Sequence, residues 1–232
     1  MRNIINLLKY NFGKYHTRKS LILYIVGLVI LLFNSIGIIT KVPIISQIMS
    51  FVNVGFIVTF LSINFIWSIF KFQSQISKEK GKLLFTFPVK SSEFIIAKIM
   101  EFIILQGIIV FVASLSSLFT KGDFMNLTNI SSIAVMFGTT VAYIIIISYT
   151  IICSSYINNK ALRIFAIIIG GGTIQLIVQG IIKIVTWFLP YIYMEVGSFI
   201  EIDVISLLLN FAWIAFITWL AIDYLDKKLD II

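Results

Sequence analysis

The sequence predicts an all-α membrane protein with six transmembrane helices, preceded by a helix that lies in the membrane interface. Hydrophobic residues make up 59% of the 232 residues and charged residues only 12%, which is about half the charged share of a soluble domain. The mean hydropathy is +1.06. Several windows of about 20 apolar residues are each long enough to cross roughly 30 Å of hydrocarbon as a helix. This composition excludes an ordinary soluble domain.

Six apolar segments are continuous enough to be spans. They are residues 20–40, 44–70, 94–119, 130–157, 161–189 and 204–223. None shows the alternation of apolar and polar residues that marks a strand of a membrane barrel, so we expect helices. Together they form one transmembrane domain over residues 20–223, followed by a tail at 224–232.

Residues 1–19 are too polar to cross a membrane. Apolar side chains recur there at spacings of three and four residues, at Ile4, Ile5, Leu8, Phe12 and Tyr15. Lysine and arginine side chains lie mostly away from them. This pattern predicts a helix that lies in the inner membrane interface with its cations toward the headgroups. The alternative is a frayed basic tail.

The positions of the cationic residues set the orientation of the chain. Of 18 lysines and arginines, 15 precede the first span, lie in or beside the second and fourth connections, or follow the last span. Cations concentrate on the cytoplasmic side of membrane proteins, so both termini are expected in the cytoplasm. The net charge of +8 therefore reflects topology and not nucleic-acid binding, because the basic residues follow the membrane edge and form no patch. The heavy use of Ile, Lys and Asn suggests a bacterial cell membrane.

The connections on the outer side are short. Residues 41–43 read as a tight turn and residues 120–129 as a polar loop. Residues 190–203 are too apolar for a free loop. We expect this connection to dip back into the outer leaflet as short helices, which need protein or water around their backbone groups.

Amide side chains within the spans are candidates for a substrate path. An unpaired amide in lipid is costly, so each should face another helix or a wet cavity. The best candidates are Asn64 and, one helical turn apart, Gln175 and Gln179. Hydrogen bonding between helices is the competing interpretation. The run 170–172 of three glycines allows close helix packing or a hinge.

The sequence carries no catalytic or metal-binding pattern. Gly81 and Lys82 lack the first glycine of a phosphate-binding loop, so the chain is expected to bind no nucleotide and to be no enzyme. His16 is the only histidine and Cys153 the only cysteine, which excludes a cysteine metal site and an intramolecular disulfide. We therefore expect no cofactor bound by this chain.

Acidic residues within membrane helices would indicate a proton or ion relay. Glu93, Glu101 and Asp223 fall at or near the inner ends of the predicted spans. Ion-coupled transport is therefore not favoured.

The most specific signal is the charged stretch 77–101 between the second and third spans. Glu79 and Gly81 are followed by a leucine pair, then by Thr86-x-Pro88-Val89, an acidic residue at 93 and Ala97-Lys98. In this order and position the stretch resembles the cytoplasmic loop of ABC-2 type transporter permeases. Lys82 departs from the family, which often has threonine there.

The resemblance implies a coupling helix within a loop at about 71–93 that binds a separate ATPase subunit. The contact residues that it implies are Lys78, Glu79, Lys80, Gly81, Lys82, Leu83, Leu84 and Phe85. ATP and Mg²⁺ would be held by that partner. The alternative is a solvated inner loop.

The resemblance further implies a permease subunit of an ATP-driven exporter that pairs with a second copy of itself or with a related permease. The small size is similar to that of permeases that export amphipathic peptides, such as phenol-soluble modulin exporters and lantibiotic immunity permeases. Twenty-one phenylalanines suit an apolar or amphipathic cargo, and drugs or lipids remain alternatives. The rival class is a non-ABC membrane protein, such as the substrate-binding component of a vitamin importer.

Overall fold

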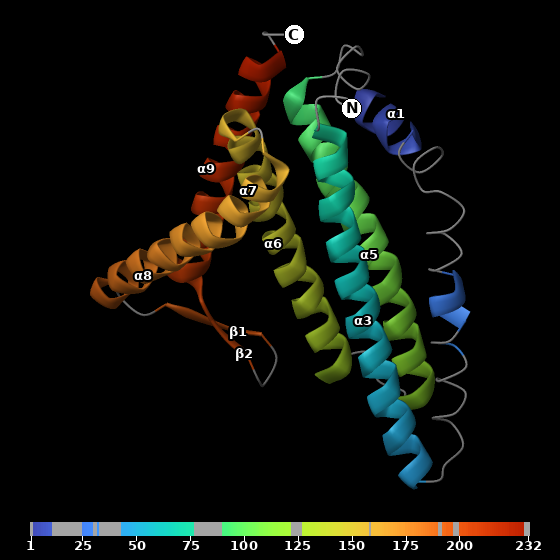
Figure 1. Ribbon diagram of the computed structural model, residues 1–232. Helices are drawn as coiled ribbons and strands as arrows, with labels where there is room; N and C mark the ends of the chain where they lie inside the picture. Colours follow the sequence, from blue (N-terminus) through green and yellow to red (C-terminus); the bar gives the residue numbers. More distant parts are fainter. Residues whose placement is uncertain are drawn as a thin grey trace. The chain divides into compact units, whose positions relative to one another are not determined.

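The computed structural model of the protein describes residues 2–10, 25–29, 32, 43–76, 90–121, 127–157, 159–189, 192–196 and 200–229. These residues are mostly helical. In chain order, and with the labels of Figure 1, the elements are α1 (Arg2–Tyr10), α3 (Pro43–Ile76), α5 (Ser91–Lys121), α6 (Leu127–Tyr156), α7 (Lys160–Phe165), the π-helical turn η2 (Ala166–Gly171), α8 (Gly172–Phe188), β1 (Tyr193–Val196), β2 (Ile200–Asp203) and α9 (Val204–Leu229).

Among the described residues, five helical segments are long and apolar enough to cross a membrane. They are Gly55–Ile76, Ser91–Leu115, Ser132–Ser154, Ala161–Phe188 and Val204–Lys227. They correspond to the second through sixth spans that the sequence predicts. The predicted first span, at 20–40, lies largely outside the described residues, and those described within it, 25–29 and 32, are helical.

The helix α3 is longer than a membrane requires. It has 34 residues and, at 1.5 Å per residue, a length of about 51 Å, against about 30 Å of hydrocarbon. Pro43 begins it, at the position in a helix where the missing N–H costs nothing. The helix continues to Ile76, past the predicted end at residue 70. The segment of α3 that could cross a membrane, Gly55–Ile76, ends at the same residue.

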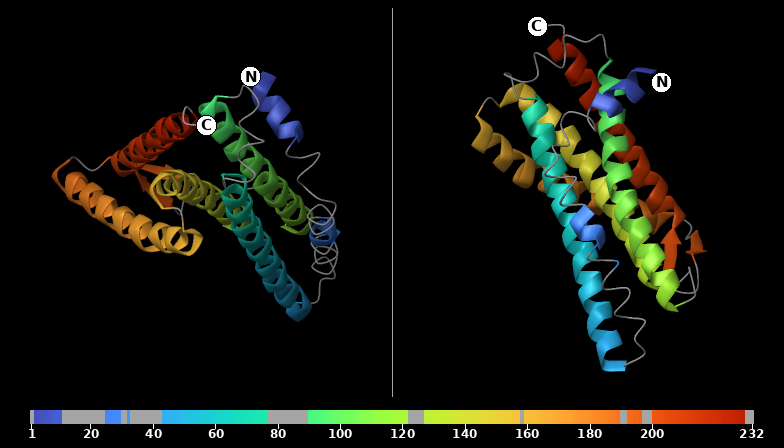
Figure 2. Two further views of the ribbon diagram at one scale, coloured as in Figure 1. Left: turned by 45° about the horizontal axis from the view of Figure 1, so that its top comes forward. Right: turned by 90° about the vertical axis from the view of Figure 1, so that its right-hand side faces the viewer.

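The chain divides into two compact units, and the division falls within α6. Unit 1 consists of Met1–Gln75 and Thr86–Tyr143, and unit 2 consists of Ile76–Phe85 and Ile144–Ile232. The described parts of each unit can be followed by colour in Figure 2.

Unit 1 is built on the antiparallel helices α3 and α5, with the end of α3 and the start of α5 at the same end of the pair (Figure 1). One half of their interface is apolar, with a buried cluster of Ile57, Leu61, Ile109, Val110 and Ala113. Aromatic pairs follow toward the connection, where Phe72 stacks on Phe94 with ring centroids 6.1 Å apart.

The N-terminal helix α1 packs against α5. The Asn3 amide donates a hydrogen bond of 3.0 Å to Glu93 Oε2, and the Lys90 backbone N–H donates to the same oxygen at 3.4 Å. A carboxylate in the first turn of a helix satisfies N–H groups that have no partner within the helix. Glu93 therefore fixes both the start of α5 and the position of α1. Whether α1 lies in the membrane interface stays a prediction.

In unit 2 the predicted fifth span is one continuous helix that changes its winding. Asn159 caps α7 by accepting from the Ala161 and Leu162 N–H groups, and the π-helical turn η2 then leads into α8 at the glycine run. A Cβ atom on Gly171 would lie 3.2 Å from the Tyr149 ring. The glycine thus permits close approach to α6, and the irregular winding lies where the sequence allows a hinge.

The expectation of short helices at 190–203 is wrong. Two strands form there, and they pair antiparallel from Tyr193 opposite Asp203 to Val196 opposite Ile200. Pairing satisfies the backbone groups of an apolar segment without a helix. Asp203 ends β2 and caps α9, because its Oδ1 accepts the N–H of Ile205 at 3.0 Å and of Ser206 at 3.3 Å.

Candidate functional site

Three charged side chains meet inside unit 1, between α3 and α5. Lys71 Nζ lies 2.5 Å from Glu101 Oε1, and Lys98 Nζ lies 2.9 Å from Glu101 Oε2. Lys98 and Glu101 are neighbours on α5 because residues three apart share a helix face. Lys71 reaches them from α3. We call Lys71, Lys98 and Glu101 the ionic cluster.

Two members of the ionic cluster are buried, and the third, Lys71, is partly exposed. Lys98 is 3% exposed and Glu101 is 5% exposed. Ions at this depth are stable only when they are paired and hydrogen-bonded. Each oxygen of the carboxylate receives one ammonium group, so the cluster joins the two helices through a single side chain.

Aromatic rings surround the ionic cluster. Phe102 stacks on Tyr143 of α6 with ring centroids 4.2 Å apart, and both are fully buried. Among these groups lies a cavity of about 10 Å³, lined by Ser68, Lys71, Phe72, Lys98, Glu101, Phe102 and Tyr143. Such a space holds about one water molecule when polar groups line it.

Glu101 does not lie at a helix end, contrary to expectation. It lies ten residues after the start of α5 at Ser91, inside the apolar segment Ser91–Leu115. The spacing of Lys98 and Glu101 within an apolar helix was the available sequence signal. Lys71 is 30 residues away from Glu101 in the sequence, and only the fold brings it near.

Polar side chains continue along the α3–α5 interface on both sides of the ionic cluster. Asn64 and Gln106 are fully buried, and Gln106 Nε2 donates to the Leu61 carbonyl at 3.4 Å. Toward the connection, Gln75 and Ser91 are also buried. Within the described part of the chain, the amide of Gln75 and the hydroxyl of Ser91 find no hydrogen-bond partner.

Unit 2 also has polar contacts between helices, but they are neutral. Trp213 Nε1 donates to Gln175 Oε1 at 3.2 Å, and Gln179 Nε2 donates to Asn210 Oδ1 at 2.6 Å. Asn210 in turn donates to the Ser206 carbonyl at 2.8 Å. These bonds join α8 to α9.

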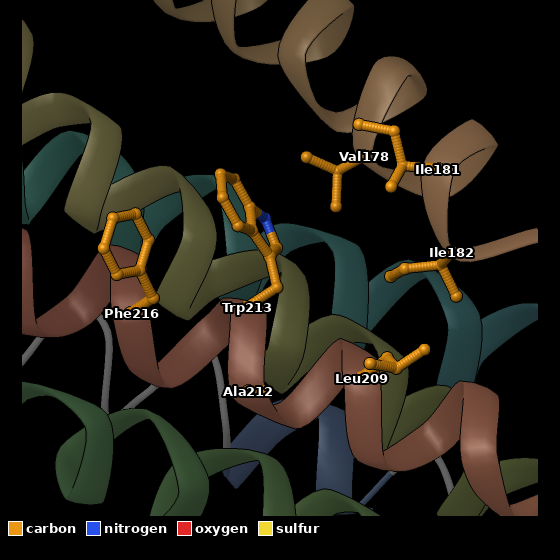
Figure 3. Close-up of a pocket in the computed structure, with 7 residues that line it drawn as sticks. All are labelled: Val178, Ile181, Ile182, Leu209, Ala212, Trp213 and Phe216. Carbon is orange, nitrogen blue, oxygen red and sulfur yellow. The ribbon is translucent and has the colours of Figure 1, made fainter. Parts of the chain in front are cut away.

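An apolar groove lies beside the amide pairs, between α8 and α9 (Figure 3). Its volume is about 340 Å³, and it is lined by Val178, Ile181, Ile182, Leu209, Ala212, Trp213 and Phe216. Figure 3 shows the side chains of α8 and α9 facing each other across the gap, with the Trp213 indole pointing toward α8. The groove and the two amide pairs give this face both apolar and hydrogen-bonding character.

The predicted site residues do not come together in one described site. Residues 78–85, the predicted ATPase contact, lie outside the described residues. Asn64 belongs to unit 1, and Gln175 and Gln179 belong to unit 2. Gln175 and Gln179 bond to α9 within unit 2, which favours the interpretation that these two amides pack helices together.

Among the described residues, no group of three or more His, Cys, Asp or Glu side chains is arranged to hold a metal ion. Comparison with protein-family models, curated proteins and solved structures finds no match for this chain.

Proposed function

We propose that the chain is the membrane-spanning subunit of an ATP-driven exporter of the ABC-2 type, in a bacterial cell membrane and with both termini in the cytoplasm. The observation that carries this proposal is the ordered series from Glu79 to Lys98, placed between two membrane helices on the cation-rich side. The position of the series, which begins after α3 and ends in the first turns of α5, supports it. A second copy of the chain and two ATPase subunits complete the assembly, and the ATPase supplies the ATP and Mg²⁺ sites.

Two residues of that series lie within the described residues and have defined contacts. Glu93 binds α1 and the start of α5, and Lys98 belongs to the ionic cluster. Both therefore act in holding the helices that flank the connection. The coupling role falls to the charged and apolar side chains of residues 78–85, in which the charges pair with the ATPase and the leucines and Phe85 anchor the segment.

The cargo that suits this chain best is an amphipathic peptide. A peptide of that kind presents an apolar face and polar groups together. The face of α8 and α9 beside Gln175 and Gln179 offers an apolar groove and amides side by side. A wall with few hydrogen-bonding groups releases its cargo readily, because it holds neither face tightly.

The test is to reverse one charge in the proposed ATPase contact. Glu79→Lys is expected to lower cargo-stimulated ATP hydrolysis or co-purification with the ATPase, because a charge pair becomes a repulsion. The helical content measured by circular dichroism should stay unchanged. Asp123→Lys, on the predicted outer side, is the matched control and should behave as the unaltered chain. Mass measurement of the complex in nanodiscs should find two chains and two ATPase subunits.

The possible outcomes separate the parts of this proposal. Normal assembly and turnover of Glu79→Lys would remove Glu79 from coupling. Failure to recover any ATPase with the unaltered chain would remove the exporter assignment and favour a non-ABC membrane protein. A complex with one copy of this chain and no second permease would exclude the dimer.

A further inference from the structure

We propose that Glu101 is a positioning residue that fastens α3 to α5 beside their connection, so that a displacement of the connection moves the two helices as one body. The ionic cluster makes this contact. In the sequence, Lys71 precedes the connection and Lys98 follows it. The inference concerns this chain alone and does not depend on what the connection binds.

The positions of the lysines along the helices carry the argument. Lys71 lies five residues before the end of α3 at Ile76, and Lys98 lies seven residues after the start of α5 at Ser91. At 1.5 Å per residue these positions are about 8 Å and about 11 Å from the two helix ends. The Lys71–Glu101 pair crosses between the two helices within two turns of the end of α3, and the Lys98–Glu101 pair within α5 holds the carboxylate in place.

The chemistry of the contact resists sliding more than apolar packing does. Apolar side chains can exchange one neighbour for another at little cost, because dispersion is weak for each atom pair and has no direction. The Glu101 carboxylate has two short, directed contacts, of which the one to Lys71 crosses between the helices and the one to Lys98 lies within α5. Sliding one helix past the other would separate buried charges before new partners are reached.

Two buried polar side chains nearer to the connection, Gln75 and Ser91, do not provide a second directed contact between the helices. Gln75 and Ser91 are buried on α3 and α5, yet among the described residues their side-chain polar atoms make no hydrogen bond to each other or to other groups. Beyond the ionic cluster, the next aromatic contact is the Phe72–Phe94 stack. The charged contact between the two helices near the connection is the Lys71–Glu101 pair. The hydrogen bond from Gln106 Nε2 to the Leu61 carbonyl, at 3.4 Å, lies farther from the connection.

Exchange of charges across the interface tests the inference. In a Cys153→Ser background, spin labels are placed at the exposed positions Phe70 of α3 and Ile96 of α5, and the distribution of label distances is measured in nanodiscs. Glu101→Lys leaves three cations, and Lys71→Glu leaves one cation between two carboxylates. Each single variant is expected to broaden the distribution. The double variant Lys71→Glu/Glu101→Lys restores one anion and two cations and should narrow it again.

The remaining outcomes are also decisive. A distribution in Glu101→Lys as narrow as in the unaltered chain, or a double variant as broad as the single ones, overturns the proposal. A contact that only stabilises the fold would lower the unfolding midpoint without broadening the distribution. If Glu101→Lys does not insert, Glu101→Gln gives the same comparison with a smaller charge change. Asp223→Asn disrupts the exposed pair with Lys227 and should leave the distribution unchanged.

Discussion

The polar contacts of unit 1 and unit 2 differ in charge and in burial. In unit 1, the α3–α5 interface buries the charged side chains of Lys98 and Glu101 and the amides of Asn64 and Gln106, and Lys71 reaches them from a partly exposed position. In unit 2, α8 and α9 are joined by neutral amide and indole groups that are partly or fully exposed. The first interface is closed around its polar groups, whereas the second borders an open groove.

The two units also differ in how much of their helix surfaces the chain itself covers. Protein covers 22% of the apolar span in α3 and 44% of that in α5, but only 11% of each of the spans Ala161–Phe188 and Val204–Lys227. Charged side chains occur in membrane helices mainly where protein surrounds them. The ionic cluster therefore lies at an interface that is formed within a single chain. Neutral amides cost less when partly exposed, and the apolar faces of α8 and α9 are suited to contact lipid or a second chain.

The largest expected effect comes from removing the charge at the centre of the unit 1 interface. Glu101→Leu leaves the buried Lys98 ammonium and the partly exposed Lys71 ammonium without their shared carboxylate, and breaking a buried ion pair of this kind costs about 3–5 kcal/mol. Replacing all three members in Lys71→Leu/Lys98→Leu/Glu101→Leu should recover most of that loss, since no buried charge remains. Unfolding in mixed micelles of rising SDS content measures both.

A matched control uses the exposed ion pair of α9. Asp223→Leu removes one partner of Lys227 at the helix surface and should shift the unfolding midpoint far less than Glu101→Leu. Equal shifts in the two variants would mean that burial does not distinguish the ionic cluster from a surface pair. A triple variant less stable than Glu101→Leu would show that the charges themselves contribute net stability.

Most of this architecture follows from local sequence, and the contacts between helices do not. Continuous apolar runs predicted the helices of the last five spans, because length and hydropathy decide whether a helix can cross a membrane. The hairpin at 193–203 was missed because a short apolar segment fits a helix or a strand equally well without knowledge of its pairing. The π-helical turn before Gly172 left no sequence signal beyond three glycines.

The contacts of the candidate site were even harder to predict from the sequence than the fold. The amides were found because a polar residue in an apolar run is conspicuous, but their partners, such as Asn210 for Gln179, depend on which helix faces meet. Glu101 was read as a residue of a helix end because the start of α5 at Ser91 was not yet known. Its pairing with Lys71 joins residues of two helices, and no spacing rule within one helix predicts it.

A smaller effect is expected where unit 2 relies on close packing instead of charge. A Cβ atom at Gly171 would meet the buried Tyr149 ring at 3.2 Å, whereas nothing lies within 4 Å of a Cβ atom at Gly172. Gly171→Val should therefore destabilise the protein by about 1–3 kcal/mol through overpacking. Gly172→Val is the control and should be clearly milder in the same unfolding measurement. Equal losses at the two positions would argue that backbone conformation, and not the contact with Tyr149, selects glycine here.

The smallest effect is expected at the neutral amide pair of unit 2. Gln179→Leu, Asn210→Leu and the double variant form a thermodynamic cycle for one hydrogen bond. Such bonds between membrane helices average about 0.6 kcal/mol, because the separated helices also find polar partners. A coupling free energy near this value would show that the bond adds little to stability, and that most of what joins α8 to α9 is apolar contact. A loss of peptide export in Gln179→Leu at unchanged stability would then favour a role in the substrate path. A coupling free energy several times larger, with export that falls as stability falls, would instead mean that Gln179 packs the helices together. The charged interface of unit 1 and the neutral interface of unit 2 would then differ in chemistry but not in how strongly they hold their helices together.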